Sequence, residues 1–294
     1  MNAMFRQQCA ALDARLRTLP DKPEETAAAT LKVLWHLAAG QRLSVDSADE
    51  APLTPLDDAA LSRLAELTAQ RLAGTPLAHL SCRQRFMGLD MLAGPEALIP
   101  RRETELLARA ALALLQDMKG EELRVLDVCT GAGNLALTLA QYEVRARVFA
   151  SDLSAQAIAL AARNAEHLGL SSRVEWRSGN LLEPFDEQAF HESVDLLVCN
   201  PPYISSQKVD AMDVEISGFE PRLAFDGGPL GVRILQRLIR EAPRYLKPGG
   251  WVAFEIGLGQ GAAVQNRLRA AGTFAQIRSV PDSQGVPRCF LAAR

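Results

Sequence analysis

Long apolar runs and secretion signals are both missing from this sequence of 294 residues. No stretch approaches the roughly 20 consecutive apolar residues that a membrane-spanning helix needs. The first eight residues lack the charged-then-apolar order of a secretory signal. We therefore expect a cytoplasmic protein that has no membrane contact.

Cysteine and histidine are scarce and scattered. The five cysteines are odd in number, and neither they nor the four histidines show the close spacing of metal ligands. Free thiols are typical of a reducing compartment, so this pattern also favours the cytoplasm. We expect no metal site. The cysteines are Cys9, Cys82, Cys129, Cys199 and Cys289.

An excess of basic charge is also absent. The net charge is −3 and the pI is about 5.9, whereas proteins that bind nucleic acid mainly through phosphate contacts are basic. We therefore expect no direct nucleic-acid binding. Hydrophobic residues make up 48% of the chain, as in a globular protein with a sizeable core. The length suits one large domain and a smaller one.

The first eighty or so residues have helical spacing. We expect three helices, which cover residues 5–16, residues 23–40 with Pro23 at the start and Gly40 at the end, and a stretch from a cap at Asp57 or Asp58 to Gly74. Residues 43–56 have the composition of a polar loop.

A change of pattern follows this helical region. Residues 85–92 have the mixed apolar and turn character of a short hairpin, and residues 103–118 form a helix rich in Ala and Leu. We expect a helical domain over residues 1–85, a hairpin linker over 86–100 and a large domain over 101–294.

Strand and helix patterns alternate from Leu123 onward. This alternation predicts an α/β fold with a parallel sheet that is covered by helices on both faces. The last two of seven expected strands are close enough in sequence to pair as an antiparallel edge. The strands are expected at residues 123–128, 146–151, 173–177, 194–199, 250–256, 274–280 and 288–293.

A glycine-containing turn follows the first strand. The turn is Cys129-Thr130-Gly131-Ala132-Gly133, and its glycines lack the Cβ atoms that would keep a ligand away from the backbone. Asp152 ends the second strand, where its carboxylate can accept hydrogen bonds from both hydroxyls of a ribose. A glycine turn followed by an acid at the end of the second strand predicts an adenosine-containing cofactor.

A nicotinamide cofactor is the alternative, because Gly131, Gly133 and Ala136 satisfy the loose dinucleotide fingerprint. Asp127, just before the turn, is placed to meet the ammonium group of an amino-acid-bearing cofactor. Nothing in the sequence resembles hydride chemistry. We therefore favour S-adenosylmethionine.

Each of these acidic and polar residues also has a structural interpretation. Asp127 could equally organise backbone amides of the loop, and Asp152 could cap the next helix. Asn180 and Leu181 fall where a third strand end would approach an adenine, but an isolated Asn in this context also forms turns.

The tetrapeptide Asn200-Pro201-Pro202-Tyr203 follows the buried strand 194–199, so it lies at the carboxyl end of a parallel strand, where open α/β sheets bind ligands. Asn200 supplies a side-chain carbonyl, and the two prolines carry no N–H that would compete. Such a loop suits a planar NH2 group whose hydrogens are held while its nitrogen stays free to attack. The alternative is a rigid surface turn.

In these motifs the chain resembles the HemK-type family, the glutamine-N5 methyltransferases that modify peptide chain release factors. The resemblance covers nearly the whole length. It rests on residues 74–80, 98–101, 104–105, 127–133, 200–203, 219–228, 246–250, 254–257 and 260–261.

The resemblance implies a seven-stranded Rossmann-like methyltransferase domain and a small helical domain that helps to dock the release factor. It implies methyl transfer from S-adenosylmethionine, which becomes S-adenosylhomocysteine, to the glutamine of a Gly-Gly-Gln loop. Separately, we expect a monomer. Residues 129–133 would line the cofactor, Asp152 would hold its ribose, and residues 200–203 would hold the glutamine. Arg101 would lie near the substrate entrance; its alternative is a solvated surface charge.

Five residues depart from the family pattern, and they leave other substrates open. Ser81-Cys82 replaces a Thr-Gly pair, Arg102 a proline, Cys129 a glycine and Asn180 an aspartate. The alternatives are a paralogue that methylates another amide or amine, a nucleic-acid adenine N6-methyltransferase, and a module that only binds the cofactor.

Overall fold

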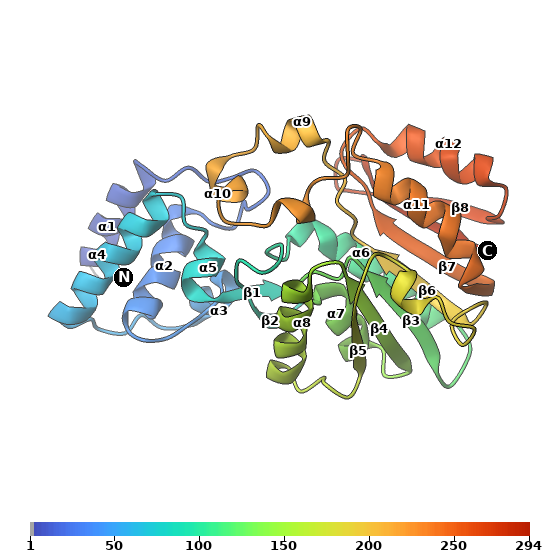
Figure 1. Ribbon diagram of the computed structural model, residues 1–294. Coiled ribbons are helices and arrows are strands. Elements are labelled where there is room, and N and C mark those ends of the chain that lie inside the picture. The colour runs from blue at the N-terminus through green and yellow to red at the C-terminus, as the bar shows by residue number, and fades with distance from the viewer. Residues whose placement is uncertain (1–2) are drawn as a thin grey trace.

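Helices and strands divide the chain into two regions in the computed structural model, which describes residues 3–294. Helices alone occupy the N-terminal region, a two-stranded hairpin follows, and a seven-stranded sheet with helices forms the rest. Figure 1 shows the N-terminal helices on one side of the molecule and the large sheet on the other, with the hairpin between them. No helix in the described residues is both long and apolar enough to cross a bilayer.

The described part of the N-terminal region, which begins at residue 3, contains five helices: α1 (Ala3–Asp13), α2 (Ala27–Ala38), α3 (Val45–Glu50), α4 (Asp58–Leu72) and α5 (Leu77–Ser81). Two boundaries follow from capping. Helix α2 begins after Thr26, whose hydroxyl accepts from the Ala29 N–H, instead of at Pro23, and Asp57 caps α4 through the Ala60 N–H. The expectation of a polar loop over 43–56 is wrong, because α3 buries Ala48 in the helical core.

The hairpin joins the two regions. Strands β1 (Arg83–Phe86) and β2 (Leu89–Leu92) pair antiparallel, so the hairpin begins two residues before the expected range of 85–92. Met87 and Gly88 form its turn, both with positive φ (49° and 81°), as two-residue hairpin turns require. Phe86 and Met91 are fully buried in the core of the α/β domain. The domain limits expected from the sequence stay a prediction.

The large sheet has the strand order β5-β4-β3-β6-β7-β9-β8. The first five of these strands are parallel, and β9 runs antiparallel to both of its neighbours. The expected α/β fold with a seven-stranded sheet is confirmed; β7 begins four residues earlier than expected. The strands are β3 (Leu123–Val128), β4 (Ala146–Asp152), β5 (Val174–Ser178), β6 (Val194–Cys199), β7 (Leu246–Glu255), β8 (Gln276–Pro281) and β9 (Pro287–Ala293).

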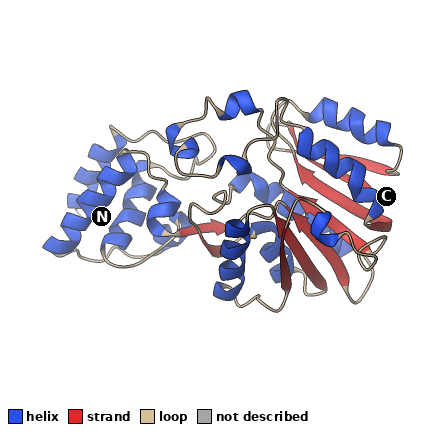
Figure 2. Ribbon diagram, viewed as in Figure 1, coloured by secondary structure: helices blue, strands red, loops and turns tan. Residues whose placement is uncertain are grey.

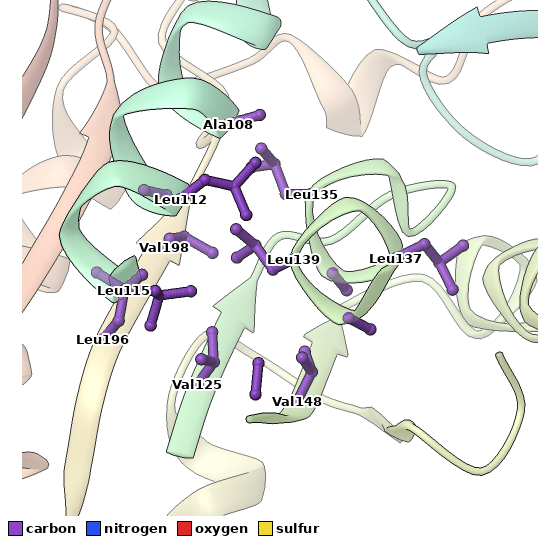
Figure 3. Close-up of a cluster of buried hydrophobic side chains, with 14 of the residues drawn as sticks. Ala108, Leu112, Leu115, Val125, Leu135, Leu137, Leu139, Val148, Leu196 and Val198 are labelled. Carbon is purple, nitrogen blue, oxygen red and sulfur yellow. The ribbon is translucent and has the colours of Figure 1, made fainter. Parts of the chain in front are cut away.

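Helices cover both faces of this sheet (Figure 2). On one face, side chains of α6 (Glu105–Asp117) and α7 (Asn134–Tyr142) pack on β3, β4 and β6; Figure 3 shows Leu112, Leu135 and Leu139 turned toward Val125 and Val198. Helix α8 (Ala155–His167) extends this layer. On the other face lie α11 (Arg233–Glu241) and α12 (Gly261–Ala271). Burial on both faces explains why β6 is apolar at nearly every position.

A long connection between β6 and β7 reaches back to the N-terminal helices. It carries α9 (Ser206–Val209), α10 (Val214–Ser217) and the short helix η3 (Arg222–Ala224). In Figure 1 this connection arches from the carboxyl end of β6 toward the N-terminal helices, with α10 beside them.

A buried cluster of charges joins the connection to the helical region. Glu215 on α10 accepts from Arg71 (2.7 Å) and from Lys22 (3.2 Å), and Arg71 also pairs with Glu25 (2.9 Å). Each of these side chains is at most 9% exposed. Burial raises the pKa of Glu25, and the positive charges of Lys22 and Arg71 oppose that shift. Removal of one partner would therefore leave a charge buried without compensation.

Arg71→Met tests this cluster. The change removes both ion pairs of Arg71 and leaves Glu25 and Glu215 with only Lys22 between them, so we expect a loss of about 3–5 kcal/mol in the free energy of unfolding. Urea denaturation measures it. Arg240→Ala, which removes a guanidinium that is 73% exposed and pairs with Glu241, is the control and should barely move the midpoint. Equal, small effects of the two changes would contradict a structural role for the cluster.

Candidate active site

The carboxyl ends of three adjacent strands form the floor of the site. Parallel pairing places Val128 of β3 opposite Ser151 of β4 on one side and opposite Cys199 of β6 on the other. The loop after β3 therefore lies between Asp152, the last residue of β4, and Asn200, the first residue after β6. Ligands of open α/β sheets bind at this position.

Asp127 supports the glycine loop from below. Its Oδ2 accepts from the Thr130 hydroxyl (2.6 Å) and from the Ala136 N–H (3.0 Å), and its side chain is fully buried. Burial raises the pKa of Asp127 to about 7, against the effect of these two hydrogen bonds. The geometry matches the interpretation in which Asp127 organises the loop.

Asp152 holds the loop from the side. Its Oδ2 accepts from the Gly131 N–H and its Oδ1 from the Ser154 N–H, both at 2.9 Å. Burial raises the pKa of Asp152, and these backbone hydrogen bonds oppose the shift. The alternative that Asp152 caps the next helix is wrong: the cap of α8 is Ser154, whose hydroxyl accepts from the Ala157 N–H.

An open cavity lies above this loop, and we call it the glycine-loop cavity. Gly131 borders it with φ of +57°, and no heavy atom lies within 4 Å of the position that a Cβ would take. The sequence-predicted residues that line it are Cys129, Thr130, Gly131, Asp152, Asn180, Leu181, Asn200, Pro202 and Arg101.

Three residues predicted for the cofactor site do not line this cavity. Asp127 lies beneath the loop, Ala132 is buried, and Gly133 packs against α8 and β5. A Cβ on Gly133 would lie 2.9 Å from the Trp176 ring and 3.1 Å from Ala161. Their role is therefore to shape the loop from behind.

The rim of the cavity near Asn180 is set by backbone geometry. Leu181 has a left-handed φ of 54° and is buried, and its carbonyl accepts from the Ser151 hydroxyl at 2.7 Å. The amide of Asn180 lies 3.4 Å from a carboxylate oxygen of Glu183. Beside them, the Leu153 side chain lines the cavity and is 55% exposed, which gives a flat ring an apolar surface to cover.

The side chain of Asn200 is oriented by one neighbour. Its Nδ2 donates to the Thr104 hydroxyl at 3.1 Å, and Thr104 is almost completely buried. Because the amide nitrogen is engaged by Thr104, the Oδ1 atom remains as an acceptor that no described residue occupies.

Tyr203 is anchored by a buried acid. Its hydroxyl donates to Glu255 Oε1 at 2.8 Å and lies 3.4 Å from a carboxylate oxygen of Glu103, which pairs with Arg288 at 3.1 Å. Burial, followed by the charges of Glu255 and Glu103, raises the pKa of Tyr203 well above its ordinary range. Tyr203 is therefore a neutral hydrogen-bond donor.

A second open cavity lies on the other side of the tetrapeptide, and we call it the tyrosine cavity. Pro201 and Tyr203 line it, together with the exposed side chains of Leu230 and Leu258. The two cavities share Asn200, Arg101, Leu98 and Ala224. Asn200 therefore stands where a ligand in one cavity would meet a ligand in the other.

Arg101 is buried and ion-paired, so its interpretation as a solvated surface charge is wrong. It is 6% exposed and pairs with Glu220 at 2.5 Å and with Asp21 of the N-terminal region at 3.1 Å. Glu220 also accepts from the Ile99 N–H at 2.8 Å. Arg101 thus joins the wall shared by both cavities to the helical region.

Comparison with known proteins gives a consistent family. A family model described as a methyltransferase domain matches residues 119–260. The release factor glutamine methyltransferase of Moorella thermoacetica is 41% identical over 81% of this chain and 82% of its own length. The protein of the same name from Koribacter versatilis is 35% identical over 97% of both chains.

The chain belongs to the release factor glutamine methyltransferase family. The recognition of this family from the sequence motifs is confirmed. Solved structures agree on the fold: a methyltransferase from Pyrococcus furiosus has 18% identity and a TM-score of 0.51, covering 78% of this chain and 98% of its own. The catalytic domain of hMettl16, solved with an RNA hairpin, has 17% identity and a TM-score of 0.54 over 76% of this chain and 79% of its own.

Three residues at the site of this methyltransferase were not predicted from the sequence: Thr104, Glu255 and Gln260. Glu255 had the clearest signal, because it is an acid at the end of a buried strand, as Asp127 and Asp152 are. Thr104 and Gln260, like Glu255, lie in segments that carry the family resemblance (104–105, 254–257 and 260–261). The resemblance gave them no role at the site, because their contacts are made to residues far away in sequence.

Gln260 and two glycines hold the backbone of the tetrapeptide. Gln260 Nε2 donates to the carbonyl of Tyr203 (3.0 Å) and to that of Gly231 (3.2 Å), while its Oε1 accepts from the Gly257 N–H (2.9 Å). A Cβ on Gly231 would lie 2.2 Å from the Tyr203 carbonyl oxygen, and one on Gly227 would lie 2.6 Å from that of Pro202. The tetrapeptide is therefore enclosed by backbone that has no room for side chains.

Gly231→Ala tests this close approach. Both Gly231 (φ +68°) and Gly249 (φ +81°) have left-handed backbones, but only at Gly231 would the new methyl group collide with the tetrapeptide. Gly249→Ala should cost about 1 kcal/mol of unfolding free energy from backbone strain alone. Gly231→Ala should cost clearly more, measured by urea denaturation of both variants. Equal losses would show that the loop has room to move.

Proposed function

We propose that this protein transfers a methyl group from S-adenosylmethionine to the side-chain amide nitrogen of the glutamine in the Gly-Gly-Gln motif of peptide chain release factors. The observation that carries the proposal is the position of Asn200 between two cavities, with its amide nitrogen held by Thr104. Membership in the release factor glutamine methyltransferase family supports it.

The glycine-loop cavity fits S-adenosylmethionine. Gly131 leaves space at the backbone, Asp152 has a carboxylate at the rim, and Leu153 offers an apolar surface to a flat ring. Asp152 would hold the ribose hydroxyls, Asn180 and Leu181 would lie against the adenine, and residues 129–131 would border the amino-acid end. When bound, the cofactor supplies a methyl group on a positively charged sulfur.

The tetrapeptide would activate the acceptor by position and charge. A primary amide nitrogen is a poor nucleophile because its lone pair is delocalised into the carbonyl. Asn200 Oδ1 and the Pro201 backbone carbonyl would accept the two N–H hydrogens of the glutamine and so stabilise the positive charge that develops on nitrogen. The methylated nitrogen becomes acidic and loses its proton to water, so no strong base is needed.

The neighbouring side chains would complete the acceptor site. The hydroxyl hydrogen of Tyr203 is directed at Glu255, which favours stacking of the ring on the amide plane over a hydrogen bond to the amide carbonyl. Pro202 would stiffen the loop, and Arg101 would border the entrance of the substrate. Alignment of nitrogen, methyl carbon and sulfur would supply much of the rate.

The release factor would dock on the helical domain, residues 1–85, with residues 86–100 as the linker to the catalytic domain. The exposed leucines of the tyrosine cavity, Leu230 and Leu258, would receive apolar parts of the substrate loop. We place this reaction in the cytoplasm, where release factors act, and expect a monomeric enzyme.

Mass spectrometry of a release factor after incubation with the enzyme and S-adenosylmethionine tests the function directly. The expected result is one added methyl group on the glutamine of the Gly-Gly-Gln motif. Duplex DNA, RNA and free glutamine serve as parallel substrates. Methyl transfer to nucleic acid but not to the release factor would refute the proposal in favour of an adenine methyltransferase.

Asn200→Ala should remove most of the turnover and leave cofactor binding nearly unchanged. The loss of an oriented hydrogen-bond acceptor of this kind costs about 3 kcal/mol in the activation barrier, or on the order of a hundredfold in kcat. Calorimetric titration with S-adenosylhomocysteine measures the cofactor affinity. Asp152→Ala is the matched comparison. Unlike Asn200→Ala, it should weaken the binding of S-adenosylhomocysteine. Wild-type turnover by Asn200→Ala would refute the assignment.

A further inference from the structure

Glu255 is a buried acid that the proposed reaction has not used. It ends β7 and is 1% exposed. A carboxylate at such a position loses the stabilisation of water, which makes its ionised form costly. Burial and the charge of Glu103 raise the pKa of Glu255 to about 7, and the effects of Thr104, Tyr203 and Arg288 oppose that rise. The residue therefore titrates near neutral pH.

The carboxyl group of Glu255 contacts Tyr203 of the tetrapeptide and lies near Thr104, which holds Asn200. Its Oε1 accepts from the Tyr203 hydroxyl at 2.8 Å. The Thr104 hydroxyl, which accepts from Asn200 Nδ2 at 3.1 Å, lies close enough to lower the pKa of Glu255. Its Oε2 is buried and has no hydrogen-bond partner of good geometry among the described residues. One acid thus accepts a hydrogen bond from Tyr203 and has Thr104, the partner of Asn200, as a neighbour.

The charged and titratable groups around Glu255 come from three other elements. Glu103 lies on the short helix η1 (Arg102–Thr104), Tyr203 follows β6, and Arg288 and Cys289 lie on β9. Arg288 pairs with Glu103 at 3.1 Å, so its charge is shared between two acids. The Cys289 thiol has a pKa raised by burial and by the charge of Glu255, so it stays neutral. The negative charge of Glu255 is therefore only partly compensated.

We propose that Glu255 is a positioning residue for methyl transfer, which in its ionised form holds the Tyr203 ring and, through Thr104, the Asn200 amide in the orientation that receives the acceptor glutamine. This inference rests on the proposed function and adds a residue to it. The ionised carboxylate is the stronger acceptor for the Tyr203 hydroxyl. It also places a negative charge behind the loop that meets the developing positive charge on nitrogen.

The direction of the pH dependence follows from the two states of the acid. When Glu255 is protonated, its own hydrogen competes for the Tyr203 oxygen, and the phenol is free to turn toward Glu103. Turnover should therefore rise as the pH rises through about 7. The folding stability that this group contributes changes in the opposite direction to turnover. Because the pKa of Glu255 in the folded protein lies above the ordinary value of 4.5, the free energy of unfolding falls as the pH rises from 4.5 to about 7.

Glu255→Gln is the central test, with an intact release factor as substrate and saturating S-adenosylmethionine. The variant keeps an acceptor for Tyr203 but has no charge. We expect kcat to fall about tenfold or more at a pH near 8, KM for the release factor to stay within about twofold, and the rise of kcat with pH to disappear. Glu166→Gln, which changes an exposed acid on α8, is the control and should keep the wild-type profile.

Two controls separate positioning from other effects. Asp127 also has a pKa of about 7, but it lies under the glycine loop. Its titration should therefore change the affinity for the cofactor, and saturating S-adenosylmethionine removes that effect from kcat. Because the charge of Glu255 is buried and only partly compensated, its removal relieves the cost of burying that charge. A denaturation midpoint at or above that of the wild type then excludes unfolding as the cause. A wild-type kcat and pH profile in Glu255→Gln would overturn the proposal.

Thr104 provides a second test that does not depend on Glu255 variants. Thr104→Val keeps the shape of the side chain and removes the hydroxyl that holds Asn200, so kcat should fall while KM changes little. Thr104→Ser restores the hydroxyl and should recover most of the activity. Failure of Thr104→Ser to exceed Thr104→Val would overturn the part of the proposal that runs through Thr104.

A measurement without substrate keeps this inference separate from the proposed function. Tyr203→Phe, Glu255→Gln and the double variant form a cycle of urea denaturation midpoints, measured near pH 8. If the charge of Glu255 strengthens its hold on Tyr203, the two changes should be non-additive. Additive midpoints would overturn the positioning role. If the wild type methylates no release factor, the proposed function fails, and this cycle still decides whether Glu255 holds Tyr203.

Discussion

The parallel pairing of β3 with β6 is the constraint on which the site depends. It sets Val128 opposite Cys199, so the glycine loop and the tetrapeptide begin side by side, although they are some seventy residues apart in the chain. The same sheet places the end of β4 on the far side of the glycine loop and the end of β7 behind the tetrapeptide. The carboxyl ends of four strands therefore bring together Asp127, Asp152, Asn200 and Glu255.

The tetrapeptide is held from outside because it has little means of holding itself. Its prolines donate no hydrogen bonds, so its shape depends on the neighbours that contact it. Thr104 binds the Asn200 side chain, Glu255 binds the Tyr203 hydroxyl, and Gln260 binds the Tyr203 carbonyl. These three residues come from η1, the end of β7 and the start of α12, so three separate segments of the domain hold one loop.

Charges are buried where separate parts of the chain meet. Arg71, Glu25 and Glu215 join the N-terminal helices to the connection after β6, and Arg101 joins the cavity wall to Glu220 and Asp21. Buried ion pairs add little net stability compared with apolar contacts, but the removal of one partner is costly. Such pairs therefore fix how the two regions sit on each other, which sets the shape of the shared wall between the cavities.

Local pattern in the sequence was sufficient for the α/β class, seven strands within a few residues, and the two loops at the strand ends, because strand periodicity and glycine turns are properties of neighbouring residues. The local pattern did not predict α3, a helix of six residues that is stabilised by the burial of Ala48. It also did not decide whether Arg101 lies on the surface or in the interior. Thr104, Gln260 and Glu255 act across the fold on residues that lie 96, 57 and 52 positions away, and no pattern of neighbours reports such contacts. The sequence by itself thus determined which chemical groups end each strand, and the tertiary structure alone decided how they are paired, buried and aimed, because both depend on which distant segments the sheet brings together.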